Sequence, residues 1–290
     1  MFKGSFVAIV TPFRDGKLDE AALRSLLEVH LSNGTNGIVP CGTTGESPTL
    51  SHDEYERVIE ITIEMVHGRL PVIAGTGFNA TDKTVDATRF AKKAGADGAL
   101  IVTPYYNRPT PEGIYQHFAA VAKAVDIPII VYNIPGRTGT NILPDTMARL
   151  ASIETVVGVK ESTGSLQQVQ EMIKLCGDKF TVLSGDDWAT LPLLAVGGKG
   201  VISVTANIAP RQVATVISEW EKGNVAAARE LHYKLWPLHS TLFIETSPTP
   251  VKTALGMMGK INPEVRLPLV PMLPNNRTKL EMALKDFGLL

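Results

Sequence analysis

One lysine in this sequence stands where its amine could act as a nucleophile. Lys160 follows the apolar run Val156–Val159, which would carry its side chain on a buried strand toward one end of a sheet. Burial disfavours a charged ammonium and leaves a neutral amine available near neutral pH. Such an amine could capture a carbonyl substrate as an imine, whose cationic nitrogen permits C–C bond formation or cleavage at the adjacent carbon. The alternative is a lysine that snorkels to water or is salt-bridged, for example to Glu161.

Other reactive side chains end neighbouring runs. Tyr132 closes the apolar run before Lys160 and could bring a phenol close to it as a proton donor and acceptor. Thr43 and Thr44 lie in a glycine-flanked turn, where hydroxyls could relay a proton and backbone N–H groups could hold a carboxylate. A lone buried tyrosine is usually a hydrogen-bonded core residue. Three strand ends that supply a lysine, a tyrosine and hydroxyls favour a catalytic site.

Arg137 could bind a substrate carboxylate. It lies between Gly136 and Thr138, in the loop after Tyr132, and its planar guanidinium matches the shape of a carboxylate. A surface arginine on a turn is the alternative, and the loop position leaves both open.

Eight short apolar runs must position these residues. Their nearly continuous apolar character is typical of parallel strands that are covered on both faces. The runs are Phe6–Val10, Gly37–Pro40, Pro71–Ala74, Ala99–Thr103, Pro128–Tyr132, Val156–Lys160, Phe180–Leu183 and Gly200–Val204.

Amphipathic stretches such as Glu20–Leu31 separate the runs and read as helices. Eight such units favour an α/β fold of the (β/α)8 TIM-barrel type over a doubly wound sheet, which usually has fewer strands. In a barrel the carboxyl ends of the strands form the active face, so Lys160, Tyr132 and the threonine turn would meet there.

Only helical patterns follow the eighth run. They cover Pro210–Glu221, Asn224–Thr241, Pro250–Met258 and a last stretch near Thr278–Phe287. We therefore predict a barrel domain over residues 1–222 and a C-terminal helical domain over residues 223–290. The added helices could cover one side of the barrel or form an oligomer interface.

Composition excludes several other classes of function. The 290 residues are 44% hydrophobic with a net charge of −1, which indicates no nucleic-acid partner. Two cysteines without a CxxC pair and scattered histidines predict neither a disulfide framework nor a metal site. The G-x-G-x-x-A match at 75–80 follows the third run instead of opening the fold, so it is weak evidence for a dinucleotide. With no signal peptide and no apolar stretch of ~20 residues, we expect a cytoplasmic protein without membrane contact.

The loops resemble those of the dihydrodipicolinate synthase and N-acetylneuraminate lyase superfamily across essentially the whole chain. The matching motifs are Gly42–Glu46, Tyr132–Pro135, Gly158–Glu161 and Gly185–Asp187. Thr44, the Tyr105–Pro109 loop and Gly136–Gly139 are closer to the dihydrodipicolinate synthase family. Sialic acid lyases usually have serine-threonine in the first motif and lack the arginine.

The resemblance implies a condensation of pyruvate with L-aspartate 4-semialdehyde in lysine and diaminopimelate biosynthesis. Lys160 would form the imine with pyruvate, and Tyr132, Thr43 and Tyr106 would relay protons, with Tyr106 reaching into a neighbouring subunit's site. The remaining implied roles are pyruvate carboxylate binding at Thr43 and Thr44, semialdehyde carboxylate binding at Arg137, and backbone lining at Gly185 and Ile202. The family's imine is itself the electron sink, so no metal or organic cofactor is expected. A homotetramer built as a dimer of tight dimers would suit Tyr106.

Many members of the family carry an allosteric L-lysine site at the tight-dimer interface. Ser47, His52, Asn79 and Tyr105 fit that pattern. Tyr55 and Lys83 stand where lysine-sensitive members often have histidine and glutamate. A cation would then face the effector's ammonium, so we expect feedback inhibition to be weak or absent.

Two rival functions stay open. Another pyruvate-dependent aldolase, acting on sialic acid or a keto-sugar acid, would keep Lys160 and Tyr132 but need a longer polyol-binding surface, and Arg137 speaks against it. A non-catalytic barrel that serves as a binding protein would use Lys160 only structurally.

Overall fold

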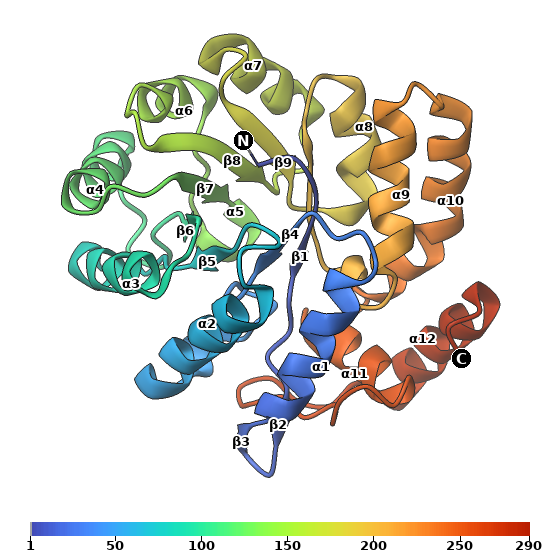
Figure 1. Cartoon of the computed structure of the whole chain (residues 1–290). Coiled ribbons are helices and arrows are strands. Elements are labelled where there is room, and N and C mark those ends of the chain that lie inside the picture. The colour runs from blue at the N-terminus through green and yellow to red at the C-terminus, as the bar shows by residue number, and fades with distance from the viewer. Residues whose placement is uncertain (1) are drawn as a thin grey trace.

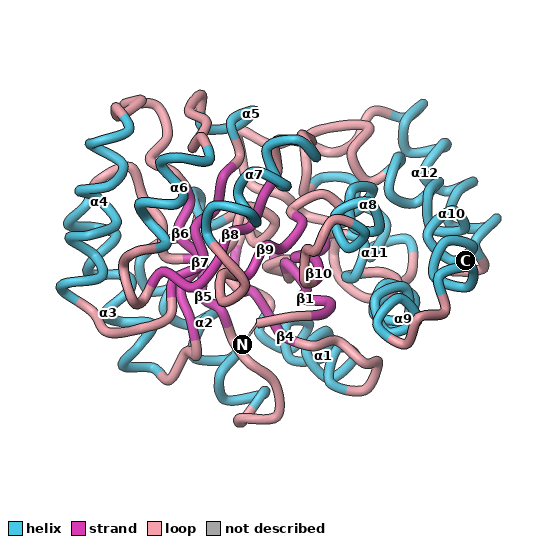
Figure 2. Tube along the Cα trace, turned by 90° about the horizontal axis from the view of Figure 1, so that it is seen from above, coloured by secondary structure: helices cyan, strands magenta, loops and turns pink. Residues whose placement is uncertain are grey.

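Eight parallel strands close into a barrel in the computed structural model, which describes residues 2–290 (Figures 1 and 2). Their order around the barrel is β4-β1-β10-β9-β8-β7-β6-β5, and a bridge between Ile38 and Val72 joins the two ends. The strands are β1 (Gly4–Ala8), β4 (Gly37–Val39), β5 (Ile73–Gly75), β6 (Gly98–Val102), β7 (Ile129–Asn133), β8 (Val156–Glu161), β9 (Thr181–Ser184) and β10 (Gly200–Ser203). The predicted TIM barrel is confirmed.

Helices surround the strands, as Figure 1 shows. They are α1 (Glu20–Leu31), α2 (His52–Val66), α3 (Thr81–Ala94), α4 (Pro111–Ala124), α6 (Pro144–Ala151), α7 (Leu166–Cys176), α8 (Thr190–Ala195) and α9 (Pro210–Glu221). Local sequence signals start and stop several of them. Ser51 and Glu54 form a capping box at the start of α2, and Gly95 ends α3 in the left-handed conformation.

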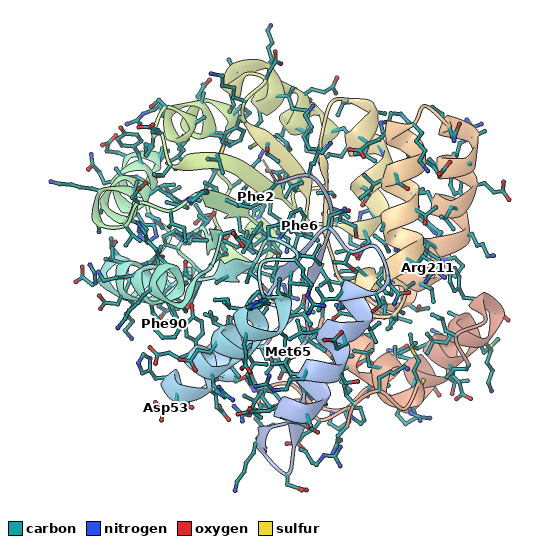
Figure 3. All side chains as sticks on the ribbon, in the orientation of Figure 1. Phe2, Phe6, Asp53, Met65, Phe90 and Arg211 are labelled. Atoms are coloured by element: carbon teal, nitrogen blue, oxygen red, sulfur yellow. The ribbon has the colours of Figure 1, made fainter. Side chains whose placement is uncertain are left out.

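Apolar side chains fill the barrel and close its amino-terminal end. Phe2 and Phe6, labelled in Figure 3, pack there with buried residues of the other strands, among them Ile130, Leu183 and Ile202. A β-carbon on Gly37 would lie only 2.1 Å from the Phe6 ring, so this strand needs a glycine to admit the aromatic side chain. The barrel is a packed core below its open end.

The C-terminal helices share the barrel's outer core. They are α10 (Val225–Thr241), α11 (Thr249–Met257) and α12 (Pro274–Phe287); α10 packs against α9, and α12 packs against α10 and α11 (Figure 1). Buried residues of these helices, such as Leu238 and Leu284, belong to the same hydrophobic cluster as Leu27 of α1. The predicted extension is therefore helical, whereas the domain division at residue 222 stays a prediction.

A small hairpin was not predicted from the sequence. Its strands, β2 (Phe13–Arg14) and β3 (Lys17–Leu18), are two residues each, too short to show a periodic pattern. Phe13 also bridges to Pro263, so the hairpin contacts the segment between α11 and α12. This contact joins the C-terminal extension to the loop that follows β1.

Candidate active site

Lys160 and Tyr132 face each other inside the barrel. They are partners in the register of β7 and β8, and parallel partners point to the same face of a sheet. Lys160 Nζ lies 4.0 Å from the centroid of the Tyr132 ring, and each residue is only 5% exposed. The predicted meeting of amine and phenol is thus present in the fold.

Glu161 points away from this pair. Its carboxylate accepts hydrogen bonds from Asn133 Nδ2 at 3.0 Å and from the backbone N–H of Thr163 at 2.8 Å. Burial raises the pKa of the Glu161 carboxyl, and these hydrogen bonds oppose the rise. Within residues 2–290 the amine of Lys160 forms no ion pair, so the salt-bridged alternative for this lysine is wrong.

The contact between Asn133 and Glu161 holds β7 against β8 one residue beyond the reactive pair. Asn133 and Glu161 are themselves register partners. Asn133 Oδ1 also accepts the backbone N–H of Ile142 at 3.0 Å, which ties the following loop to β7. We did not identify this pair from the sequence, although polar residues directly after Tyr132 and Lys160 were its signal.

Gly185, at the end of β9, gives the lysine side chain its room. A β-carbon there would lie 3.0 Å from Lys160 Cε and 1.8 Å from Ser162 Oγ. The next residue, Asp186, is half-buried. Burial raises the pKa of Asp186 to about 6; the charge of Lys160 lowers it, and Asp187 and Glu161 raise it. An acidic group therefore neighbours the amine.

The threonine turn after β4 presents two free backbone donors. The N–H groups of Gly45 and Glu46 bond within the turn, to Gly42 and Thr43 carbonyls at 3.1 Å each. The N–H groups of Thr43 and Thr44 donate to no acceptor in the part of the chain that the structure describes. Two adjacent donors at the carboxyl end of a strand suit a carboxylate.

Arg137 and Thr43 line one cavity of about 210 Å³. Val102, the register partner of Tyr132, forms part of its wall, so the cavity lies at the mouth of the barrel. Arg137 lies on a short helix, α5 (Pro135–Thr138), and its guanidinium donates to the Ser247 carbonyl at 3.1 Å. Ile202 is fully buried on β10 inside the barrel. Arg137 is exposed, and it lies at the rim of the cavity that Thr43 also lines.

Tyr106 is not brought to this site within one protomer. It is 90% exposed, and its φ of 72° is rare for a residue with a side chain. Its neighbour Tyr105 lines the cavity that holds Thr43 and Arg137. Tyr106 projects outward from the same rim.

A larger groove of about 710 Å³ lies beside the site. Ser47, His52 and Tyr105 line it, together with Tyr55 and Lys83. The Tyr55 hydroxyl donates to the Gly75 carbonyl at 2.8 Å. Tyr55 therefore lines the groove, but its hydroxyl proton is not free for a ligand. Asn79 is not among the lining residues; its carbonyl accepts the Asn107 side chain at 2.8 Å.

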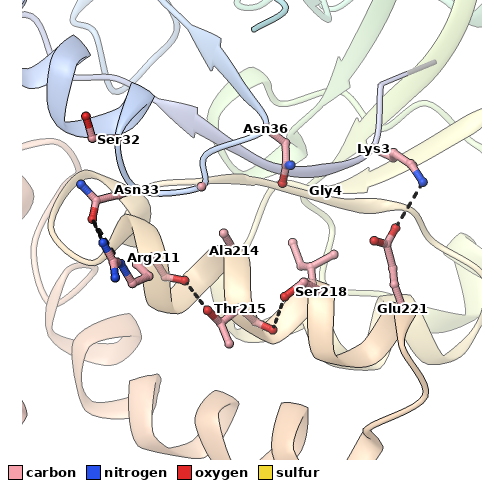
Figure 4. A pocket seen from close by; sticks show the side chains of 12 residues that line it. Lys3, Gly4, Ser32, Asn33, Asn36, Arg211, Ala214, Thr215, Ser218 and Glu221 are labelled. Atoms are coloured by element: carbon pink, nitrogen blue, oxygen red, sulfur yellow. Dashed lines mark hydrogen bonds and ion pairs between the residues drawn. The ribbon is translucent and has the colours of Figure 1, made fainter. Parts of the chain in front are cut away.

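A further hollow, of about 400 Å³, lies at the opposite end of the barrel (Figure 4). Lys3 there pairs with Glu221 at 3.7 Å, and Arg211 contacts Asn33. None of the residues singled out from the sequence lines this hollow. The carboxyl-terminal end of the barrel carries the candidate chemistry.

Two general features of the described residues bear on other kinds of site. Among residues 2–290 no cluster of His, Cys, Asp or Glu could hold a metal ion. No helix in the same range is long and apolar enough to cross a membrane.

Comparison with known proteins matches this geometry to one family. A model of the dihydrodipicolinate synthetase family matches residues 1–287. A 4-hydroxy-tetrahydrodipicolinate synthase of Syntrophus aciditrophicus is 60% identical over 290 residues, which cover both chains completely. The crystal structure of dihydrodipicolinate synthase from Aquifex aeolicus superposes with a TM-score of 0.98 at 53% identity, covering 99% of each chain. A dihydrodipicolinate synthase from Acinetobacter baumannii, complexed with pyruvate, has a TM-score of 0.98 at 46% identity and covers 100% of both chains. The chain belongs to the dihydrodipicolinate synthetase family.

Proposed function

We propose that this protein is a 4-hydroxy-tetrahydrodipicolinate synthase of lysine and diaminopimelate biosynthesis. It would condense pyruvate, held as an imine on Lys160, with L-aspartate 4-semialdehyde. The observation that carries the proposal is the buried, unpaired amine of Lys160 over the Tyr132 ring, at 4.0 Å from its centroid. An amine free of a carboxylate partner is available to attack a carbonyl.

The proposed chemistry follows from these groups. The Lys160 amine adds to C2 of pyruvate, water leaves, and the resulting iminium draws electrons from C3. Loss of a proton from C3 gives an enamine, which forms the new C–C bond with the aldehyde carbon of the second substrate. Tyr132, Thr43 and Tyr106 would carry the protons of these steps. Because the iminium accepts the electrons, the proposal includes no metal or organic cofactor.

The substrate carboxylates have separate binding groups in this proposal. The free N–H groups of Thr43 and Thr44 would hold the pyruvate carboxylate. Arg137, which lines the same cavity as Thr43, would hold the carboxylate of the semialdehyde. The backbone at Gly185 and Ile202 would line the space between them. A cytoplasmic location, as expected from the sequence, completes the proposal.

Replacing Lys160 with alanine tests the imine directly. We expect turnover to fall about a thousand-fold or more, because the variant lacks the nucleophile. Borohydride reduction with pyruvate, followed by mass spectrometry, should place a stable adduct on Lys160 of the wild type and none on the variant. The exposed Lys92→Ala variant is the control. A binding protein would show no adduct in either form, and an aldolase of another kind would show the adduct without coupling to the semialdehyde.

Asp186→Asn should change the pH dependence of stability. The pKa of Asp186 is raised in the folded protein to about 6, so folding disfavours its charged form above that pH. The wild type should therefore gain stability as pH falls from 6 toward 4. The variant should be more stable at pH 8 by up to about 3 kcal/mol, with the difference disappearing near pH 4.

Urea unfolding at fixed protomer concentration measures this difference. The exposed Asp178→Asn variant should show no such trend. An Asp186→Asn variant less stable than wild type at pH 8 would contradict the claim that burial disfavours the charged form of this carboxyl group.

Tyr106 acting across a subunit interface predicts complementation. Lys160→Ala and Tyr106→Ala protomers should each be inactive alone, yet a mixed dimer would hold one site with its own Lys160 and the partner's intact tyrosine. Random co-assembly should restore about a quarter of wild-type activity. Tyr233→Ala, at another exposed tyrosine, should stay active alone. Absence of recovery in co-expressed dimers would rule out a shared site.

Feedback by lysine should be weak in the wild type. Lys83 lines the large groove, where its charge would repel an effector's ammonium. Lys83→Glu should increase inhibition by L-lysine in an activity assay, whereas Lys93→Glu, also on α3, should not. Half-inhibition of the wild type at sub-millimolar lysine would refute this expectation.

A further inference from the structure

We propose that the buried ion pair of Glu46 and Lys252 is a positioning device for the threonine turn. Through this ion pair, the C-terminal extension would fix the positions of the Thr43 and Thr44 N–H groups, which would bind the carboxylate of pyruvate. The inference rests on the proposed function, because it assigns a reason for the placement of Thr43 and Thr44.

The pair is buried, and both of its members have further hydrogen-bond partners. Lys252 Nζ lies 2.6 Å from Glu46 Oε1, with side-chain exposures of 0% and 2%. The amine also donates to the Thr11 carbonyl at 2.9 Å, and Glu46 Oε2 accepts the backbone N–H of Arg266 at 3.1 Å. Each charge therefore has more than one partner, which holds both side chains in one geometry.

Glu46 belongs to the turn whose donors it would place. Its backbone N–H donates to the Thr43 carbonyl at 3.1 Å, and its φ is 53°. A left-handed conformation at a residue with a side chain needs support from its surroundings. The Thr11 hydroxyl donates to the Gly45 carbonyl at 2.7 Å. Thr11, whose carbonyl accepts a hydrogen bond from Lys252, therefore also contacts the turn.

An aromatic ring fixes the position of the lysine. Lys252 Nζ lies 4.2 Å from the centroid of the buried Phe13 ring, and the Arg266 guanidinium carbon lies 4.0 Å from it. Arg266 bonds both carboxylate oxygens of Glu54 at 2.6 Å. The β2–β3 hairpin, the start of α2 and the segment after α11 thus meet around one cation pair.

The same segment reaches the second substrate-binding group. The Ser247 carbonyl, just before α11, accepts the hydrogen bond from Arg137. Residues 247–266 therefore touch the elements proposed to bind both carboxylates. Apolar residues of similar volume often give comparable stability in place of a buried ion pair, so this pair suits a requirement for fixed geometry more than one for stability.

The test uses charge-removing variants in the whole protein. Glu46→Gln and Lys252→Met each leave one buried group unpaired and should lower the melting temperature. The double variant removes both charges and should recover most of it. We expect this double variant to keep a pyruvate KM raised about ten-fold, with kcat at saturating pyruvate within about two-fold of wild type. The KM for the semialdehyde should change less.

The same exchange at an exposed pair is the control. Glu281 and Lys285 pair at 2.7 Å on the surface of α12, and Glu281→Gln with Lys285→Met should leave both constants unchanged. A double variant at Glu46 and Lys252 with recovered stability and wild-type pyruvate KM would overturn the proposal in favour of a purely structural pair.

A second variant covers the case in which the double variant does not fold. Glu46→Asp keeps the charge but shortens the side chain, so it should raise the pyruvate KM. It should also speed hydrogen exchange at the amides of Gly45 and Glu46, whose hydrogen bonds close the turn. Unchanged exchange and KM would again overturn the proposal. Failure of wild-type Lys160 to form the pyruvate adduct would instead sink the proposed function, whatever these variants show.

Discussion

The site depends on the alternation of side chains along two neighbouring parallel strands. Successive residues of a strand point to opposite faces, and parallel partners point to the same face. In β7 and β8 this rule sends Tyr132 and Lys160 together into the barrel and sends Asn133 and Glu161 together outward. A shift of one residue in either strand would separate the amine from the phenol, and in β8 it would turn the Glu161 carboxylate inward. The outer contact between Asn133 and Glu161 opposes that shift.

The closed barrel then determines what surrounds the amine. Packed aromatic and aliphatic side chains fill the end that carries Phe2, so only the carboxyl-terminal mouth stays open. The loops at that mouth contribute an acidic group at Asp186, the free donors of the threonine turn and the guanidinium of Arg137. Each comes from a different strand, and this division of roles is typical of the fold. The C-terminal extension contacts the loop after β4 through the buried ion pair of Lys252 and Glu46.

Much of this arrangement could be predicted from the sequence because parallel strands in a barrel are continuously apolar. The predicted runs differ from the observed strands by no more than a few residues at either end, and the bounds of α1 match the predicted stretch. The adjacency of Lys160 and Tyr132 followed from their places at the ends of successive runs. The salt bridge considered for Lys160 was wrong because a neighbour in the same strand faces the other side.

What the sequence did not reveal depends on contacts between distant segments. Lys252 occurs in a helical pattern, and nothing local indicates that it is fully buried against Glu46. The β2–β3 hairpin is too short for periodicity, yet its Phe13 organises two cations. The partnership of Tyr106 with another subunit and the lysine site stay predictions, because one protomer does not contain the groups that would test them. The domain boundary also stays a prediction, since the C-terminal helices share one hydrophobic cluster with α1.

A crystal structure of the protein with pyruvate is the most direct test of the central claim. The account predicts continuous density from Lys160 Nζ to C2 of pyruvate, with the carboxylate on the N–H groups of Thr43 and Thr44. An unmodified Lys160 at saturating pyruvate, or pyruvate bound at another place in the barrel, would contradict it.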